Sequence, residues 1–299
     1  MATYRDKTYD AESYQAARPR YRDSFVDDLL AYHSEGNPAA GRRLAVDVAT
    51  GTGIFARLLP PHFDRVVATD VSDTMLRSAR AASDGADIEF VEAPAEDLSF
   101  LGTGTVDVMT VAVAAHWFDI ERFVAEAARV LKPGGTLAIF GSTGFGHFVD
   151  YPQCDKMLKD FGLADDKVGS HWDKGRECLV NGYRDYHRAL SQHGWTGIRR
   201  CISTRDIEGE AASGCPSVLV RGPAVVDFAV TWRALQEYLQ TWSALHRYHK
   251  EHPDRENLAK VVVREMMAAS GATDMDEALS IEWEEIALMC HPPRTHVDE

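Results

Sequence analysis

A strand–turn–helix pattern between Leu44 and Leu59 constrains the fold of this chain more than any other feature. The segment, LAVDVATGTGIFARLL, opens with the apolar run 44–48, which is long enough for a buried strand. Gly51 and Gly53 then follow one residue apart, and such glycines let a backbone approach a ligand without an intervening Cβ atom. The helix expected after them would direct unpaired N–H groups at that ligand. The pattern therefore predicts a site for a nucleotide-like cofactor.

Two classes of cofactor are compatible with the glycines alone. The spacing Gly51-x-Gly53-x-x-Ala56 fits a dinucleotide fingerprint, and Asp70 follows after about 20 residues, where a ribose-binding acid is expected. Asp47 favours a different cofactor. Its carboxylate at the end of the strand would be unfavourable beside a pyrophosphate, whereas a cofactor with an amino group and a sulfonium would be stabilised there.

Four motifs in a fixed order decide between these classes. VDVATGTG, VVATDVSDTML, VEAPAEDL and VLKPGGTLAIF resemble the class I S-adenosylmethionine-dependent methyltransferases in order and spacing. The resemblance extends from Tyr14 to about Phe140, and more loosely beyond. It implies an α/β fold with a Rossmann-like, doubly wound, mostly parallel seven-stranded sheet, helices on both faces and an added helical, aromatic lid. It also implies S-adenosyl-L-methionine as cofactor and S-adenosyl-L-homocysteine as product.

Two later motifs resemble a narrower branch, the trans-aconitate methyltransferase-like enzymes. Residues 114–118, AAHWF, match that branch after its fourth strand, and residues 238–244, YLQTWSA, match one of its helices. The branch implies a carboxylate oxygen of a small organic molecule as the methyl acceptor. Transfer to sulfur or nitrogen of a secondary metabolite remains an alternative, as does a regulatory protein that binds S-adenosylmethionine without turnover.

The composition limits the partners. The chain has 32 Lys and Arg against 46 Asp and Glu, which disfavours nucleic acid and anionic membranes and leaves a small molecule or another protein. No run approaches the roughly 20 apolar residues of a membrane helix, and the polar N-terminus has no signal-peptide core, so we expect a cytoplasmic enzyme. None of the five cysteines forms a C-x-x-C pair, so neither a disulfide framework nor a zinc site is expected.

The whole chain, 1–299, is expected to form one methyltransferase domain. The oligomeric state, monomer or homodimer, and the strands between 198 and 231 stay open. The expected parts in chain order are an N-terminal arm and helix at 1–34, a cofactor-binding core at 42–141, insertions forming a substrate lid at 142–279, and a last strand at 280–290. Expected strands within these parts are 44–48, 65–69, 88–91, 106–113, 136–140, 198–204, 226–232 and 280–289, and expected helices include 23–33, 231–250 and 255–269.

The cofactor residues follow from the resemblance and from their positions at strand ends. Asp70 would accept hydrogen bonds from the ribose hydroxyls, and Arg18 would pair with the methionyl carboxylate. Met75 is either core or a wall of the adenosine pocket, and Ala95 and Glu96 would read the adenine ring. The full expected set is Tyr14, Arg18, Asp47, Thr50, Gly51, Thr52, Gly53, Asp70, Val71, Met75, Ala95, Glu96 and Ala112.

The acceptor residues are expected at the carboxyl edge of the sheet and in the lid. His116 is the candidate catalytic residue, because a histidine can act as general base near neutral pH. The alternative is that His116 only hydrogen-bonds the acceptor or shapes the pocket. No metal is needed if the acceptor is already anionic. The expected acceptor-binding residues are His116, Trp117, Trp172, Tyr183 and Trp242.

Overall fold

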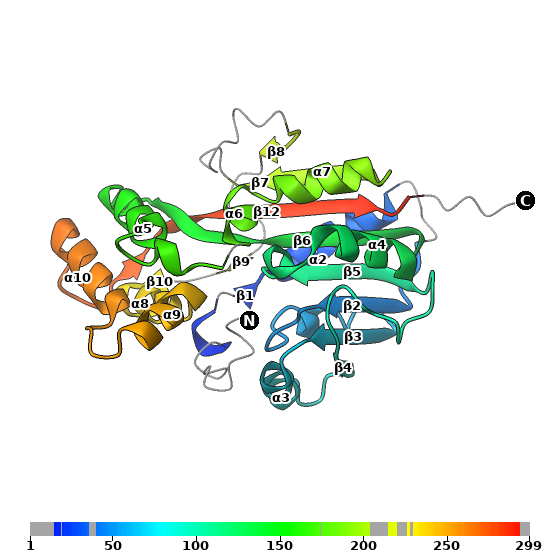
Figure 1. Cartoon of the computed structure of the whole chain (residues 1–299), viewed down its shortest axis with the longest axis horizontal. Coiled ribbons are helices and arrows are strands. Elements are labelled where there is room, and N and C mark those ends of the chain that lie inside the picture. The colour runs from blue at the N-terminus through cyan, green and yellow to red at the C-terminus, as the bar shows by residue number, and fades with distance from the viewer. Residues whose placement is uncertain are drawn as a thin grey trace, which may run out of the picture.

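A long sheet joins two parts of the molecule. The computed structural model describes residues 15–18, 20–35, 40–173, 175–203, 215–219, 226–227 and 230–293. Figure 1 shows a sheet flanked by helices at one end and a group of helices at the other, joined by two long strands. Tyr14, one of the expected cofactor residues, lies outside the described residues.

The predicted α/β class and the Rossmann-like, mostly parallel sheet are confirmed. Strands β2, β3, β4, β5 and β6 are parallel to one another, and β12 runs antiparallel to both β6 and β7. The described residues give the sheet eight strands rather than seven, because the two-residue β8 extends its edge. Their spatial order is β4 (Ile88–Glu92), β3 (Arg65–Asp70), β2 (Leu44–Val48), β5 (Val106–Ala112), β6 (Leu131–Phe148), β12 (Ile281–His291), β7 (Thr196–Ile202) and β8 (Val218–Leu219).

Helices cover both faces of this sheet because its strands are apolar on both sides. Successive side chains of a strand point to opposite faces. Ala45 and Val108 accordingly pack with Leu29 in one core cluster, whereas their neighbours Val46 and Met109 pack in a second cluster. The covering helices are α2 (Asp23–Ser34) on the first face and α4 (Ile120–Val130) and α7 (Arg184–Gln192) on the second, with α3 (Asp73–Ala82) beside β3 and β4.

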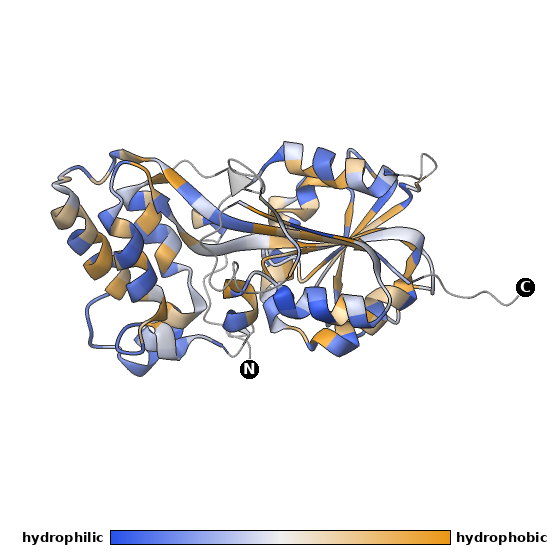
Figure 2. Cartoon of the chain, turned by 90° about the horizontal axis from the view of Figure 1, so that it is seen from above, coloured by the Kyte–Doolittle hydropathy of each residue, from blue (hydrophilic) through white to orange (hydrophobic). Residues whose placement is uncertain are grey.

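The helical part is carried by an extension of the sheet. We expected a strand only at 136–140 before the lid, but β6 continues to Phe148 and pairs with β12 along this length. The two strands leave the parallel core together, and Figure 2 shows them reaching the helices at the far end. Those helices are α5 (Gln153–Leu163), α8 (Trp232–Gln240), α9 (Ser243–Glu251) and α10 (Leu258–Ser270).

Three local predictions were wrong in detail. The glycine turn leads into turns and the short 3-10 helix η2 (Ala56–Leu58) rather than a full α-helix, because the N–H groups of Leu58 and Leu59 bond to carbonyls only three residues back. The alternation at 226–232 gives two separate two-residue strands, β9 (Val226–Asp227) and β10 (Val230–Thr231), which pair with β1 (Arg20–Tyr21) and β11 (Ala278–Leu279).

The third error concerns the helix expected at 231–250. It is divided into α8 and α9, because Trp242 adopts an extended backbone conformation with ψ of 130°. Thr231 caps α8 by accepting a hydrogen bond from the Ala234 N–H at 3.1 Å, as its position predicted. The break places Trp242 and Ser243 at the inner end of α9, where both line the pocket described below.

Candidate active-site pocket

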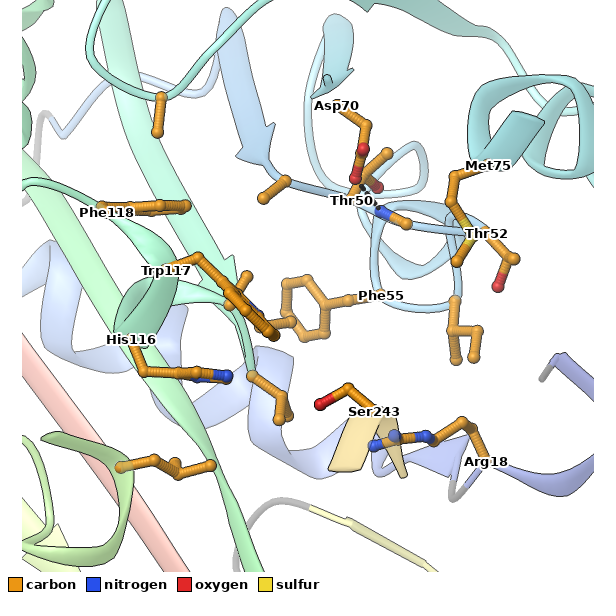
Figure 3. Close-up of a pocket in the computed structure, with 18 of the residues that line it drawn as sticks. Arg18, Thr50, Thr52, Phe55, Asp70, Met75, His116, Trp117, Phe118 and Ser243 are labelled. Atoms are coloured by element: carbon orange, nitrogen blue, oxygen red, sulfur yellow. Dashed lines mark hydrogen bonds between the residues drawn. The ribbon is translucent and has the colours of Figure 1, made fainter. Parts of the chain in front are cut away.

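A cavity of about 310 Å³ lies at the carboxyl ends of the parallel strands. Strand β2 lies at the centre of the parallel strands. The chain adds β3 and β4 on one side of it, and then returns to add β5 and β6 on the other side. Ligands of open α/β sheets bind where this order reverses. The cavity is lined by segments that follow β2, β3, β4 and β5, and by residues of the lid. Figure 3 shows part of this lining.

Most of the expected site residues meet in this one cavity. They come from the arm, the strand ends and the lid, which are far apart in the sequence. The expected residues that line it are Arg18, Thr50, Gly51, Thr52, Asp70, Val71, Met75, Ala95, Glu96, Ala112, His116, Trp117, Trp172 and Trp242.

The Asp70 carboxylate connects the ends of β2 and β3. Its Oδ2 accepts a hydrogen bond from the Gly51 N–H at 2.9 Å, and its Oδ1 accepts one from the Ser72 N–H at 2.8 Å. Each carboxylate oxygen has two lone pairs, so this orientation is compatible with further hydrogen bonds from ribose hydroxyls. A Cβ atom added at Gly51, where φ is +57°, would meet no protein atom within 4 Å. The loop is therefore open toward the space that a cofactor would use.

Asp47 does not line the cavity, contrary to the expected direct contact. Its side chain is buried, with Oδ2 accepting from the Thr50 hydroxyl and Oδ1 from the Thr110 hydroxyl, both at 2.6 Å. Burial raises the pKa of Asp47 to about 6. The Asp47 carboxylate lies beneath the loop and binds the hydroxyl of Thr50, and Thr50 in turn lines the cavity.

Gly53 is likewise absent from the lining. A Cβ atom there would lie 3.3 Å from Ala79 of α3 and 3.3 Å from the Arg57 guanidinium. The glycine thus permits the loop to pack on α3, and its φ of +74° favours glycine as well. The sequence pattern identified the loop correctly but did not separate the glycine that faces the cavity from the one that faces the protein.

His116 and two arginines form the opposite end of the cavity. His116 belongs to the 3-10 helix η3 (Ala115–Trp117), and its buried Nδ1 has no hydrogen-bond partner among the described residues. Burial, followed by the charges of Arg176 and Arg18, lowers the pKa of His116 to about 3. The imidazole is therefore neutral at physiological pH. Figure 3 shows His116 and Arg18 on the side of the cavity away from Asp70, both pointing into it.

Aromatic rings hold both guanidinium groups. Arg176, in α6 (Arg176–Val180), lies 4.3 Å from the Trp172 ring centroid and donates a hydrogen bond to the Thr143 carbonyl. Arg18 lies 5.4 Å from the Tyr238 ring centroid and donates to the Thr241 carbonyl at 3.3 Å. These contacts fix two positive charges at the cavity, in a chain whose net charge is −14.

Several lining residues were not expected from the sequence. Tyr238 and Ser243 belong to the quoted YLQTWSA motif, so the motif that supplied Trp242 offered them as candidates as well. Arg176 has no motif around it. The unexpected lining residues are Tyr21, Ala49, Ile54, Phe55, Ala93, Pro94, Val113, Ala114, Phe118, Ser142, Thr143, Arg176, Leu179, Tyr238 and Ser243.

Two non-glycine residues of the lining have left-handed backbone conformations. Ala49 has φ of 53° and Val113 has φ of 51°, directly after β2 and β5. This conformation is uncommon for alanine and costly for a β-branched valine. Gly141 lies against Val113, and a Cβ atom there would approach the Val113 side chain to 2.8 Å. The glycine thus makes room for a strained turn at the edge of the cavity.

Tyr183 was expected to bind the acceptor, but the structure places it in the core. Its side chain is fully buried beside Tyr186, with ring centroids 6.0 Å apart, and it does not line the cavity. The Tyr183 hydroxyl has no hydrogen-bond partner among the described residues. By contrast, the Tyr186 hydroxyl donates to the Ala115 carbonyl at 2.8 Å.

These two tyrosines give a matched pair of variants. Tyr183→Phe should leave the free energy of unfolding unchanged or raise it by up to about 1 kcal/mol, because it removes an unsatisfied buried hydroxyl. Tyr186→Phe should lower it by about 1 kcal/mol, because a made hydrogen bond is lost. Urea denaturation followed by circular dichroism measures both. Destabilisation by Tyr183→Phe, or loss of methyl transfer with intact folding, would contradict this placement.

Two further observations concern the rest of the chain. All five cysteines are free thiols. Within the described residues, no helix combines the length and the hydropathy that crossing a membrane requires.

Comparisons with known proteins agree with the fold. Residues 46–139 match the model of a methyltransferase domain. A Saccharomyces cerevisiae protein described as a probable S-adenosylmethionine-dependent methyltransferase is 25% identical over 96% of this chain and 97% of its own. The methyltransferase ptaI of Pestalotiopsis fici is 37% identical, but the match covers only 43% of this chain and 41% of that protein.

A solved structure resembles nearly the whole chain. It is described as a candidate type II methyltransferase from Anaeromyxobacter dehalogenans, with 25% identity, a TM-score of 0.63, and coverage of 93% of this chain and 99% of its own. The similarity therefore includes the helical part as well as the sheet. These three relatives do not test the resemblance to the trans-aconitate branch, which stays a prediction.

The matched domain spans β2 to the first part of β6, the segments that supply the glycine loop and Asp70. The dinucleotide interpretation of the glycines is thereby set aside. Residues 46–139 match a methyltransferase domain, and the full-length similarities to the yeast protein and to the Anaeromyxobacter structure agree with an S-adenosylmethionine-dependent methyltransferase whose methyl donor is S-adenosylmethionine.

Proposed function

We propose that this methyltransferase esterifies a small organic acid of secondary metabolism by transferring the methyl group to a carboxylate oxygen. The observation that carries the proposal is the second arginine of the cavity, Arg176, beside His116. Arg18 has its expected partner in the methionyl carboxylate of the cofactor. Arg176 lines the same cavity as a second cationic group, and a guanidinium is suited to bind a carboxylate through two parallel hydrogen bonds.

The charges of the cavity are separated in a way that suits this orientation. Asp70 and Glu96 lie among the segments after β3 and β4, where we propose that the ribose and adenine bind. Arg18 and Arg176 lie beside His116 at the other end. An anionic acceptor is attracted to the arginine end and repelled from the acidic end, so the charges orient it before any contact is made.

The state of His116 favours an acceptor that needs no deprotonation. S-adenosylmethionine supplies a methyl group on a sulfonium, and attack by a carboxylate oxygen forms the ester bond as the carbon–sulfur bond breaks. A carboxylate is already ionised near neutral pH. His116, with a pKa of about 3, is a weak base. We therefore assign it to hydrogen bonding with the acceptor rather than to proton removal, which a phenol, thiol or amine would require.

Aromatic side chains line the cavity. Trp117, Trp172, Tyr238 and Trp242 are among them. These rings fit an acceptor with an apolar body, and their faces can also stabilise the sulfonium charge. Since Trp172, Tyr238 and Trp242 belong to the predicted lid at 142–279, we propose that the sheet and the lid act as one catalytic unit.

The acceptor class can be tested with labelled donor. We expect transfer of labelled methyl groups to aromatic or branched aliphatic acids, and none to phenols, thiols or amines of the same skeletons. The product should release methanol in mild base, as methyl esters do and methyl ethers, thioethers and amines do not. Label that is stable to base would overturn the carboxylate assignment and favour sulfur or nitrogen transfer.

Arg176 should determine the affinity for the acid. Loss of a charged hydrogen-bond donor costs about 1.5–3 kcal/mol, so Arg176→Gln should raise KM for the acid by about 10- to 150-fold. Binding of S-adenosylhomocysteine should change little. Arg188→Gln, at an exposed arginine of α7, is the matched control. An unchanged KM in the Arg176 variant would remove the main support for an anionic acceptor.

The pH profile tests the role of His116. Since its pKa is lowered from 6.5 to about 3, the ring stays neutral above pH 4, and His116 should contribute no limb to the kcat profile between pH 5 and 8. His116→Gln should lower kcat or raise KM without changing the shape of the profile. If kcat of the native enzyme instead falls at low pH with a midpoint near 6.5, and this fall is absent in His116→Gln, then His116 is a general base.

Asp70 is proposed to hold the ribose. Asp70→Ala should weaken binding of S-adenosylhomocysteine by about 1.5–3 kcal/mol, because a charged acceptor of two hydroxyl groups is lost. Isothermal titration calorimetry measures this affinity. Asp73→Ala, at the exposed first turn of α3, should have no such effect. Unchanged affinity in a folded Asp70 variant would show that another group binds the ribose.

A further inference from the structure

Two histidines and a glutamate meet on the helical part, outside the cavity. His171 ends the 3-10 helix η4 (Gly169–His171), while Glu251 and His252 lie at the end of α9. Their ligating atoms all lie within 4.8 Å of one another. Imidazole nitrogens and a carboxylate oxygen are donors that Zn²⁺ accepts. We propose that His171, Glu251 and His252 bind a zinc ion.

The measured spacing fits such an ion. Zinc–ligand bonds of about 2.0–2.1 Å at tetrahedral angles separate neighbouring ligand atoms by about 3.4 Å. His171 Nε2 and Glu251 Oε2 are 3.4 Å apart. Glu251 and His252 are exposed, so a small side-chain rotation brings the third ligand to the same spacing. Three protein ligands leave the fourth position for water.

The surroundings direct His171 toward this point. Its Nδ1 lies 3.2 Å from the Ser170 hydroxyl, and a hydrogen bond from Nδ1–H to that oxygen leaves the lone pair of Nε2 on the side of Glu251. The Tyr248 ring packs beside both histidines, with centroids 5.2 Å from His171 and 4.7 Å from His252. The histidines are thus positioned by neighbours that do not compete for the ion.

Nearby groups are accounted for separately. Arg247 forms an ion pair with Asp173 and donates to the His171 carbonyl at 3.4 Å, so its positive charge is balanced by a carboxylate. His249 is not part of the cluster, because its Nε2 accepts a hydrogen bond from the Leu258 N–H at 3.3 Å. The overall charge of −14 also favours a cation at the surface.

A bound ion would join two segments that shape the acceptor pocket. His171 directly precedes Trp172, whose ring holds Arg176 and whose Nε1 donates to the Gly162 carbonyl at 2.6 Å. The other two ligands end α9, the helix that begins beside Trp242 at the cavity. Zinc at this point would therefore connect η4 to α9 and restrict the movement of the aromatic lining.

Zinc binding can be measured on the full chain without any methyl transfer. After treatment with a chelator, the protein should bind one Zn²⁺ with micromolar affinity, as measured by competition with a chromophoric chelator. His252→Ala and Glu251→Gln should each weaken binding by at least about tenfold, as loss of even outer contacts does at metal sites. Both side chains are exposed, and circular dichroism should show the native fold in each variant.

A second histidine–glutamate pair provides the matched control. His193 Nε2 lies 2.6 Å from Glu121 Oε2, and this pair is not part of a cluster of three such ligands among the described residues. His193→Ala should therefore bind zinc as the native chain does. Co²⁺ in place of zinc should give the strong visible absorption of a four-coordinate site, absent in His252→Ala. Failure of the native chain to bind zinc, or equal binding by the His252 and Glu251 variants, would overturn the proposal.

Discussion

The two hydrogen bonds accepted by Asp70 are the interaction on which the proposed cofactor end of the cavity depends. By binding the N–H groups of Gly51 and Ser72, one carboxylate fixes the loop after β2 against the end of β3. Beneath that loop, Asp47 holds Thr50 through a partly buried hydrogen bond. The two acids are thus used differently: one lines the cavity, and the other supports the loop that lines it.

The acceptor end depends on the extension of β6 and β12 beyond the parallel core. A parallel sheet alone presents only strand ends to a ligand, and these already form the proposed cofactor end of the cavity. The paired strands carry the helices across the cavity, so that Trp172, Arg176 and Trp242 close it from the side opposite Asp70. The strained turns at Ala49 and Val113 lie at the edge between these two contributions.

The resulting cavity combines opposite charges with an aromatic lining. Asp70 ends β3 and Glu96 lies in the turn after β4, whereas Arg176 comes from the lid, so the separation of charge follows the division between the two parts of the molecule. His116 lies among the arginines, and their charge, together with burial, keeps its ring neutral. A histidine in this setting serves hydrogen bonding better than proton transfer.

The sequence by itself determined the sheet, the glycine loop and the placement of Asp70, because strand periodicity and turn glycines are properties of contiguous residues. It could not show that Asp47 and Gly53 turn away from the cavity, since the direction of a side chain depends on what packs beneath the loop. Only the tertiary structure decided the acceptor end. Arg176 meets His116, Tyr183 enters the core, and His171 approaches His252 because folding brings together segments with no shared local pattern.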